Sequence, residues 1–292
     1  MTSNLTDNWV TADMTKFVVF ILSHGRASFC KENTYNILRS CGYTGKVIIV
    51  CDNEDTTIEE YYKEFGKDNV YVFDKEKEAR QVDELNNFNN RKCDIFARNA
   101  MWNIAKELGY MYFQQLDDDY YYFGHRRIEG AKKTLCYSLV AKWFVEFLLN
   151  TPDYVKTIAF AQGGDHIGGY DENILYKRKA MNSFFCLTSR PFKFIGTFNG
   201  DVNTYTSLNI QGNLFLTFLS FDLSQADTQQ ATGGAAELYK SFGTYVKSFT
   251  TVMIAPSCVQ VRMMGDKYYR LHHNIKWGRC TPKIVSEEYK KK

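Results

Sequence analysis

The segment from Ala97 to Tyr120 constrains the fold of this chain most, because it predicts a helix, a strand and an acidic loop in succession. Apolar residues recur at helical spacing from Ala100 to Leu108, and Gly109 is a natural helix C-cap. Residues 110–116 then alternate as in a strand and lead into Asp117-Asp118-Asp119. The aspartates are therefore expected where a buried strand emerges from a sheet, the usual place for a ligand site in an open α/β fold.

These aspartates have two possible roles. Two carboxylates one residue apart at a strand end can bind a hard divalent cation, and such a cation can bind a diphosphate. A solvated acidic turn after a core strand is the alternative interpretation of the same residues.

Three further apolar runs of strand length precede this segment, at residues 16–22, 46–51 and 69–73. Helical spacing over residues 33–41 separates the first two runs, and each run ends in polar residues. Strands that alternate with helices predict a right-handed parallel α/β unit. Its ligand is expected across the carboxyl ends of the strands.

Several nucleotide-binding signatures are absent from the sequence. No G-x-G-x-x-G follows the first strand, and no G-x-x-x-x-G-K-[ST] occurs. The Gly-rich, Arg-containing signature of nucleotidyltransferases is also missing at that position. Dinucleotide binding and nucleotidyl transfer are therefore not supported.

Length and cysteine usage limit the class of protein. A chain of 292 residues is long enough for one large α/β domain with an appended region. Its eight cysteines are scattered without a C-x-x-C pair, which predicts buried free thiols in a reducing compartment and hence a cytoplasmic protein. No apolar run approaches the roughly 18 residues of a membrane span, and the polar N-terminus does not resemble a signal peptide. No membrane association is expected.

Positive charge is concentrated in a few segments. Residues 262–292 contain nine lysines and arginines against three acidic residues, and smaller basic clusters lie within residues 126–133 and 177–179. Aromatic residues, including those of 120–123, lie between these basic residues. This combination suits a polyanionic partner, and a solvated face with a disordered lysine tail is the alternative.

The helix, strand and aspartate pattern resembles the nucleotide-sugar-dependent glycosyltransferases of the GT-A fold. In that family an A-R-N helix and an apolar strand precede a D-D-D or D-x-D motif, which binds Mn²⁺ or Mg²⁺ and through it the donor's diphosphate. The resemblance implies an α/β fold with a Rossmann-like, mixed, mostly parallel sheet flanked by helices and an elaboration on the C-terminal, acceptor side. Residues 1–292 would form one domain, with the nucleotide sugar bound by residues 1–123 and the sugar and acceptor by residues 124–292.

The resemblance also implies roles for residues of the first half. Asp117 and Asp119 would contact the metal or the donor, with Asp118 beside them, and Arg98 and Asn99 would fix the donor and the acidic loop. The loop after the first strand and the acidic residue after the second would hold the nucleoside, and these positions are Ser23, His24, Arg26 and Asp52. His24 also fits a loop histidine with purely structural contacts, whereas the Asp52 carboxylate can accept hydrogen bonds from ribose hydroxyls or a base N–H.

In the second half, the resemblance points to a catalytic base. Asp201 matches the aspartate that serves as the base in inverting members, although Gly200 stands where those enzymes have glutamate. Asp165 and Asp222 are the next candidates. In a retaining enzyme no such base is required, and Asp201 would orient the acceptor or the sugar.

Other positions of the second half would complete the site. Gly163 and Gly164 would line the sugar pocket, although a plain glycine-rich turn fits them as well. Adjacent residues of an extended strand point to opposite faces, so only one of His272 and His273 can bind the metal. His272 is the favoured candidate. The charges of Lys276 and Lys283 would neutralise the diphosphate. Residues 224–236 have loop composition and would form a mobile lid or an ordinary connection.

The segments FVVFILSHGR, QQLDDDYYYF and LHHNIKW resemble a narrower group, the phage and kinetoplastid (base-J-type) glycosyltransferases that modify hydroxymethylated pyrimidines in DNA. This resemblance implies transfer from a UDP-sugar to the hydroxymethyl group of a pyrimidine, first of all 5-hydroxymethylcytosine, in double-stranded phage DNA. The aromatic residues 120–123 would pack on that base. The protein would be a monomer or homodimer in the host cytoplasm if phage-encoded.

Two alternatives remain open at this point. The same fold could transfer a sugar to a cell-surface glycan or a lipid-linked saccharide. A catalytically inactive nucleic-acid-binding module is the second alternative, and it leaves Arg98, Asp117 and Asp119 without a role.

Overall fold

The computed structural model describes residues 9–82, 91–126, 132–166, 175–225, 235–265 and 269–280. The strands predicted in the first half are all present. They are β1 (Phe17–Leu22), β2 (Val47–Asp52), β3 (Val70–Phe73) and β4 (Tyr112–Leu116). The helices of this half are α1 (Ala27–Cys30), a π-helical turn (Lys31–Tyr35), α2 (Asn36–Ser40), α3 (Ile58–Phe65), α4 (Lys75–Ala79) and α5 (Ile95–Glu107). Short 3-10 turns lie at Met14–Lys16 and Lys67–Asn69.

The second half adds strands to the same sheet. These are β5 (Tyr120–Arg126), β6 (Lys132–Thr134), β7 (Val155–Ala161), β8 (Tyr176–Lys177), β9 (Phe184–Leu187) and β10 (Leu214–Gln225). Helices α6 (Tyr137–Leu149) and α7 (Gly200–Ile210) lie between them. Helix α6 begins only at Tyr137, because residues 132–134 pair with β5.

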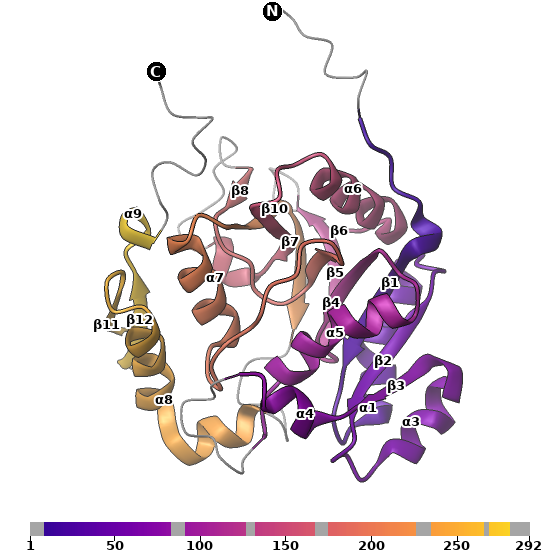
Figure 1. Cartoon of the computed structure of the whole chain (residues 1–292), viewed down its shortest axis with the longest axis horizontal. Helices are drawn as coiled ribbons and strands as arrows, with labels where there is room; N and C mark the ends of the chain where they lie inside the picture. The colour runs from indigo at the N-terminus through magenta and orange to yellow at the C-terminus, as the bar shows by residue number, and fades with distance from the viewer. Residues whose placement is uncertain are drawn as a thin grey trace, which may run out of the picture.

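The ten strands follow the order β3-β2-β1-β4-β9-β7-β10-β5-β6, and β8 pairs with β10. Strands β5, β8 and β9 run opposite to the other seven. The predicted α/β class, a mixed and mostly parallel sheet flanked by helices, is confirmed (Figure 1).

The sheet is buried on both faces, which explains why its strands read as continuous apolar runs rather than alternating ones. Along β1, Phe17, Val19 and Ile21 join one core cluster, and Val18 and Phe20 join the other. Residues of α2, α3 and α6 belong to the first cluster, and residues of α5 and α7 to the second. The helices therefore cover both faces and leave the carboxyl edge of the parallel strands for polar loops.

The strand order reverses direction between β1 and β4. The chain moves from β1 to β2 and β3 on one side, then returns to place β4 on the other side of β1. Such a switch point is the usual binding crevice of an open α/β sheet. The loops that meet there follow β1, at residues 23–26, and β4, at residues 117–119.

A C-terminal unit packs beside α7. It consists of α8 (Ala235–Ile254), the paired strands β11 (Val259–Met264) and β12 (Arg270–Ile275), and α9 (Trp277–Cys280), all on the left of Figure 1. The Ser248 hydroxyl donates to the Leu271 carbonyl at 2.9 Å, which joins α8 to β12. In the loop expected over residues 224–236, residues 224–225 end β10 and residue 235 begins α8, while residues 226–234 lie outside the described residues.

All eight cysteines are free and six of them are buried, as the sequence predicted for the thiols. Within the described part of the chain, no helix combines the length and apolar character needed to cross a membrane.

The contact between α5 and the segment after β9 yields a stability prediction. Asn99 donates to the Phe194 carbonyl at 3.0 Å and accepts from the Phe194 N–H at 2.8 Å, and all these groups are buried. Asn99→Leu leaves both backbone groups unpaired, so we expect urea denaturation to show a loss of about 2–4 kcal/mol. The matched control is Asn103→Leu at an exposed position of the same helix, which should change stability by less than about 0.5 kcal/mol. Equal losses in the two variants would show that the Phe194 contacts contribute nothing.

Candidate active site

The three aspartates after β4 have different surroundings, and Asp118 is the one that joins the two loops at the switch point. Its carboxylate accepts from the Ser23 hydroxyl at 2.6 Å and from two nitrogens of Arg26 at 2.5 and 2.8 Å. The side chain is 1% exposed. A buried, bidentate arginine pair of this kind fixes geometry strongly. Asp118 and Arg26 therefore hold the β1 loop against the β4 loop.

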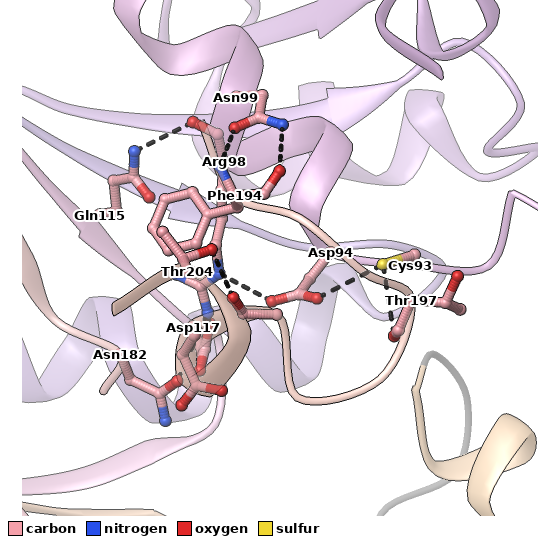
Figure 2. Close-up of polar contacts among 12 residues, drawn as sticks. Cys93, Asp94, Arg98, Asn99, Gln115, Asp117, Asn182, Phe194, Thr197 and Thr204 are labelled. Atoms are coloured by element: carbon pink, nitrogen blue, oxygen red, sulfur yellow. Dashed lines mark hydrogen bonds and ion pairs between the residues drawn. The ribbon is translucent and has the colours of Figure 1, made fainter. Parts of the chain in front are cut away.

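Asp117 is held by a second arginine, Arg98, on α5. The Arg98 guanidinium donates to Asp117 at 2.5 Å and to Asp94 at 2.7 Å, and its side chain is 3% exposed (Figure 2). Burial acts to lower the pKa of Arg98, but the charges of Asp117 and Asp94 outweigh it and raise that pKa. Burial also raises the pKa of Asp117, against the opposing charge of Arg98. Asp94 was not identified from the sequence, although it lies one turn before Arg98.

Asp119 has no such partner. Its Oδ1 atom is buried and has no hydrogen-bond partner among the described residues. Burial and the charges of Asp117 and Asp118 raise the pKa of Asp119 to about 7. A carboxylate with a buried, unpartnered oxygen and like charges beside it is a place where a cation binds favourably.

Strained backbone surrounds this loop. Outside glycine, the described residues with left-handed backbone are Asn182, Ser183 and Asn199. Asn182 lies 3.5 Å from the Arg98 guanidinium and donates to Gln225 at 2.6 Å, and the Ser183 hydroxyl accepts from the Phe160 N–H. Left-handed backbone costs about 1–3 kcal/mol at such residues and is found preferentially at functional sites.

A second polar group lies at the ends of β1 and β2. His24 Nδ1 lies 2.8 Å from the Asp52 carboxylate, and Lys75 lies 3.2 Å from the same carboxylate oxygen. The hydrogen bond with Asp52 raises the pKa of His24. Burial acts to raise the pKa of Asp52, but His24 and Lys75 outweigh it and lower that pKa. Asp52 is therefore an anionic acceptor with a half-exposed imidazole beside it.

Asp165 lies in a short 3-10 turn after β7 and is neutralised by lysines. Its carboxylate is 2.5 Å from Lys179 and 4.0 Å from Lys177, and the residue is 5% exposed. Gly163 and Gly164 are exposed in the same turn, and a β-carbon at either position would meet nothing within 4 Å. The turn thus needs no glycine for packing, and the expected ligand contact of these glycines stays a prediction.

Asp201 lies in the first turn of α7, within the electrostatic reach of Arg98, Asp94 and Lys247. Burial raises the pKa of Asp201 and lowers the pKa of Lys247. Asn199 precedes this turn and donates to the Lys247 carbonyl at 2.8 Å. The start of α7 is therefore connected to the C-terminal unit as well as to the Arg98 network.

The two late histidines, His272 and His273, lie within β12. Their rings stack at 4.3 Å between centroids, and His273 Nδ1 is 3.3 Å from the Asn199 amide. Burial and, to a smaller extent, the charge of the neighbouring His272 lower the pKa of His273 to about 3. Ladder register pairs His272 with Arg262 of β11. In the described ranges, no three His, Cys, Asp or Glu residues are grouped so as to hold a metal, so a ligand set that includes His272 stays a prediction.

The expected stacking of the aromatic residues 120–123 on an acceptor base needs correction, and the expected roles of Lys276 and Lys283 stay predictions. Tyr120 and Phe123 are fully buried in the core and cannot pack on an acceptor base, whereas Tyr121 is exposed. They are core residues because β5 is covered by α6 and the rings of Phe160 and Tyr137. Lys276 follows β12 and donates its backbone N–H to Cys258, and Lys283 lies outside the described residues.

The model of the TET-Associated Glycosyltransferase family matches residues 17–234 of this chain. The chain belongs to this family. The matched range contains β1, the aspartate loop and the α7 helix with Asp201.

Solved structures show a more distant likeness. Glucosyl-3-phosphoglycerate synthase from Mycobacterium tuberculosis, in complex with Mg²⁺ and UDP, is 11% identical over 89% of this chain and 87% of its own, with a TM-score of 0.44. The mannosyltransferase PcManGT from Pyrobaculum calidifontis, in complex with GDP-Man and Mn²⁺, is 13% identical over 86% and 73%, also with a TM-score of 0.44. S. aureus TarS 1–349 is 11% identical over 82% and 81%, with a TM-score of 0.40. No curated protein matches the sequence.

Several site residues of this glycosyltransferase had no recognisable sequence signal. Asn182 and Asn199 stand out by their left-handed backbone. Lys75 and Lys179 form ion pairs with Asp52 and Asp165, which are distant from them in the sequence. Thr34 supports the aspartate loop, since its hydroxyl donates to the Asp117 carbonyl at 2.8 Å and accepts from the Tyr120 N–H at 2.9 Å. Threonine on a helix gives no signal of such a contact.

The His24–Asp52 pair predicts a pH-dependent contribution to stability. Because the folded-state pKa of His24 is raised, protonated His24 stabilises the fold fully below its ordinary value of 6.5, and this contribution is lost as the pH rises through the folded-state pKa. His24→Ala should therefore lower the melting temperature more at about pH 5.5 than at about pH 8.5. Asp52→Asn should remove the same pH-dependent difference. A His24→Ala effect that is equal at both pH values would contradict the pairing.

Proposed function

We propose that this glycosyltransferase moves a sugar from a UDP-sugar to the hydroxymethyl group of a modified pyrimidine in double-stranded DNA, with 5-hydroxymethylcytosine in phage DNA as the first candidate. The observation that carries the proposal is the aspartate loop at the switch point. Two of its carboxylates are ion-paired with Arg26 and Arg98, and the third, Asp119, has a buried oxygen with no hydrogen-bond partner among the described residues.

The residues present fit a divalent cation, Mn²⁺ or Mg²⁺, at this loop. Asp119 supplies an oxygen without a hydrogen-bond partner among the described residues, and Asp117 supplies an oxygen that accepts only a long, 3.4 Å hydrogen bond from the Tyr120 hydroxyl within the same part of the chain. Carboxylate oxygens are the ligands that these cations prefer. Once bound, the cation supplies positive charge to the donor's diphosphate and so favours departure of the nucleotide.

The donor's nucleoside is proposed to lie over the ends of β1 and β2. Asp52 offers an anionic acceptor to ribose hydroxyls or a base N–H, and His24 lies beside it at the protein surface. The bridge from Ser23 and Arg26 to Asp118 joins this nucleoside side to the diphosphate side. One nucleotide sugar can therefore span the switch point.

Asp201 is proposed as the group that accepts the acceptor's proton, with Asp165 as the second candidate. Burial raises the pKa of Asp201, and a carboxylate with a raised pKa is a stronger base near neutral pH. Asp165 is already ion-paired with Lys179, so its carboxylate is less available to an acceptor hydroxyl. In the transfer, the acceptor hydroxyl gives its proton to Asp201 as its oxygen bonds to the anomeric carbon, and UDP leaves with the electron pair of the broken bond.

Two lines of argument support DNA as the acceptor. The family name associates these glycosyltransferases with TET, and the sequence resembles enzymes that modify hydroxymethylated pyrimidines. The basic residues of the C-terminal region suit a polyanion. The eight free cysteines fit a reducing compartment such as the cytoplasm, where phage DNA would be modified.

The metal site is tested by binding and stability as well as by activity. Titration with Mn²⁺ should raise the melting temperature of the wild-type protein, because the cation offsets the repulsion among the aspartates. Asp119→Asn removes that repulsion, so this variant should melt higher in EDTA and gain little from Mn²⁺. Transfer should fall by at least about a hundredfold in Asp119→Asn and in EDTA. Full transfer in EDTA would eliminate the metal from the proposal.

The reaction is tested by mass spectrometry of hydroxymethylcytosine-containing DNA incubated with the protein and a panel of UDP-sugars. We expect a mass gain of one sugar per modified base with at least one donor. Asp201→Asn should lower kcat by about 100-fold or more while UDP affinity stays within about threefold, because a base acts in the transition state. A parallel loss of UDP affinity would show that Asp201 is a donor contact. Transfer to a glycan but not to DNA would show that the acceptor is a glycan.

A further inference from the structure

The two-stranded hairpin β11–β12 presents one face away from the rest of the protein. In an antiparallel ladder, residues directly opposite each other share a face, and alternate residues along a strand share it too. The register therefore places three cross-strand pairs together, which we call the hairpin face: Gln260 with Asn274, Arg262 with His272, and Met264 with Arg270.

The opposite face of the hairpin is packed against the protein toward the base of the hairpin, whereas Met263 near its tip is exposed. Val259 is 1% exposed, and His273 lies 3.3 Å from Asn199 at the start of α7. The carbonyl of Leu271 accepts from Ser248 of α8. The hairpin is thus fastened through its inner face next to Asp201, and its outer face is directed to solvent.

The hairpin face is positively charged and rich in hydrogen-bond donors. Gln260, Arg262 and Arg270 are exposed, and within the described part of the chain no hydrogen bond or ion pair holds either guanidinium. Neither strand contains an acidic residue. Arginines without acidic partners on an exposed strand pair are complementary to a polyanion.

We propose that the hairpin face enters the major groove of the acceptor duplex, with Arg262 and Arg270 contacting guanine edges or phosphates and Gln260 and Asn274 contacting adenine edges. This inference rests on the proposed DNA acceptor. The major groove admits a two-stranded β-ribbon, and arginine and amide side chains make its usual bidentate base contacts. A substituent at C5 of a pyrimidine projects into the same groove. The groove that holds the reacting hydroxymethyl group is thus the groove that the hairpin beside Asp201 would occupy.

The experiment measures duplex affinity by fluorescence anisotropy across a salt series, for a short duplex that carries hydroxymethylcytosine. Arg262→Ala/Arg270→Ala should weaken binding by about tenfold or more per arginine, flatten the salt dependence and leave UDP-sugar hydrolysis unchanged. The matched control is Lys63→Ala/Lys67→Ala at α3 and the turn after it, which removes the same charge on the opposite side of the molecule (Figure 1) and should change affinity less than about twofold.

A second duplex tests the groove. Replacing guanine by 7-deazaguanine removes the N7 acceptor from the major groove and leaves the minor groove intact. Wild-type protein should bind this duplex several-fold more weakly, and the Arg262→Ala/Arg270→Ala variant should not distinguish the two duplexes.

The outcomes separate this inference from the proposed function. If the wild type transfers sugar to DNA and the arginine variant binds DNA as well as wild type does, the hairpin inference is wrong and the acceptor stands. If the wild type neither binds nor modifies DNA, both are wrong. If the arginine variant changes oligomeric state in size-exclusion chromatography without changing DNA affinity, the hairpin face is an interface between two copies of the chain, which also overturns the proposal.

Discussion

The buried guanidinium of Arg98 is the interaction on which the site depends. It links the start of α5, through Asp94, to the end of β4, through Asp117, and its plane lies over the ring of Phe184 with 5.2 Å from the guanidinium carbon to the ring centroid. Burying such a charge is costly, and the two carboxylates offset that cost only together. Removing either partner leaves an uncompensated buried charge, which typically destabilises by about 3–5 kcal/mol. The same pairs hold the aspartate loop rigid, and a rigid loop is what a diphosphate site requires. Stability and the proposed chemistry therefore depend on the same contacts.

The three adjacent aspartates show how one sequence motif is divided into different tasks. Asp118 is hydrogen-bonded to Ser23, ion-paired with Arg26 and so joins two loops, whereas Asp117 is ion-paired with Arg98. Asp119 is left with a raised pKa and a buried oxygen without a hydrogen-bond partner. A cation placed beside Asp119 would reduce the electrostatic repulsion among the three carboxylates of the loop. The strained backbone at Asn182 beside Arg98 fits the same picture, because a strained residue persists only where its surroundings hold it in place.

Asn199 connects the start of α7, which carries Asp201, with the C-terminal unit. Its amide donates to the Lys247 carbonyl and the Thr251 hydroxyl of α8 and lies against His273 of β12, while its own left-handed backbone begins the α7 helix two residues before Asp201. A helix that starts at a fixed residue aims its first-turn side chains in fixed directions. The proposed base and the proposed DNA-contacting hairpin are consequently parts of one hydrogen-bonded assembly, so the geometry of the acceptor can be set relative to the donor.

The sequence by itself determined the α/β class, the four strands of the parallel unit and the position of the aspartate loop. It could do so because apolar periodicity and chain order act locally, and because β1 and β4 must end at the same edge once they are parallel neighbours. Only the tertiary structure decided which aspartate keeps an oxygen without a hydrogen-bond partner. Whether Asp117, Asp118 or Asp119 is neutralised depends on Arg26 and Arg98, which approach from different elements. The burial of Tyr120 and the stacking of His272 on His273 were likewise decided by packing, which no local pattern in the sequence records.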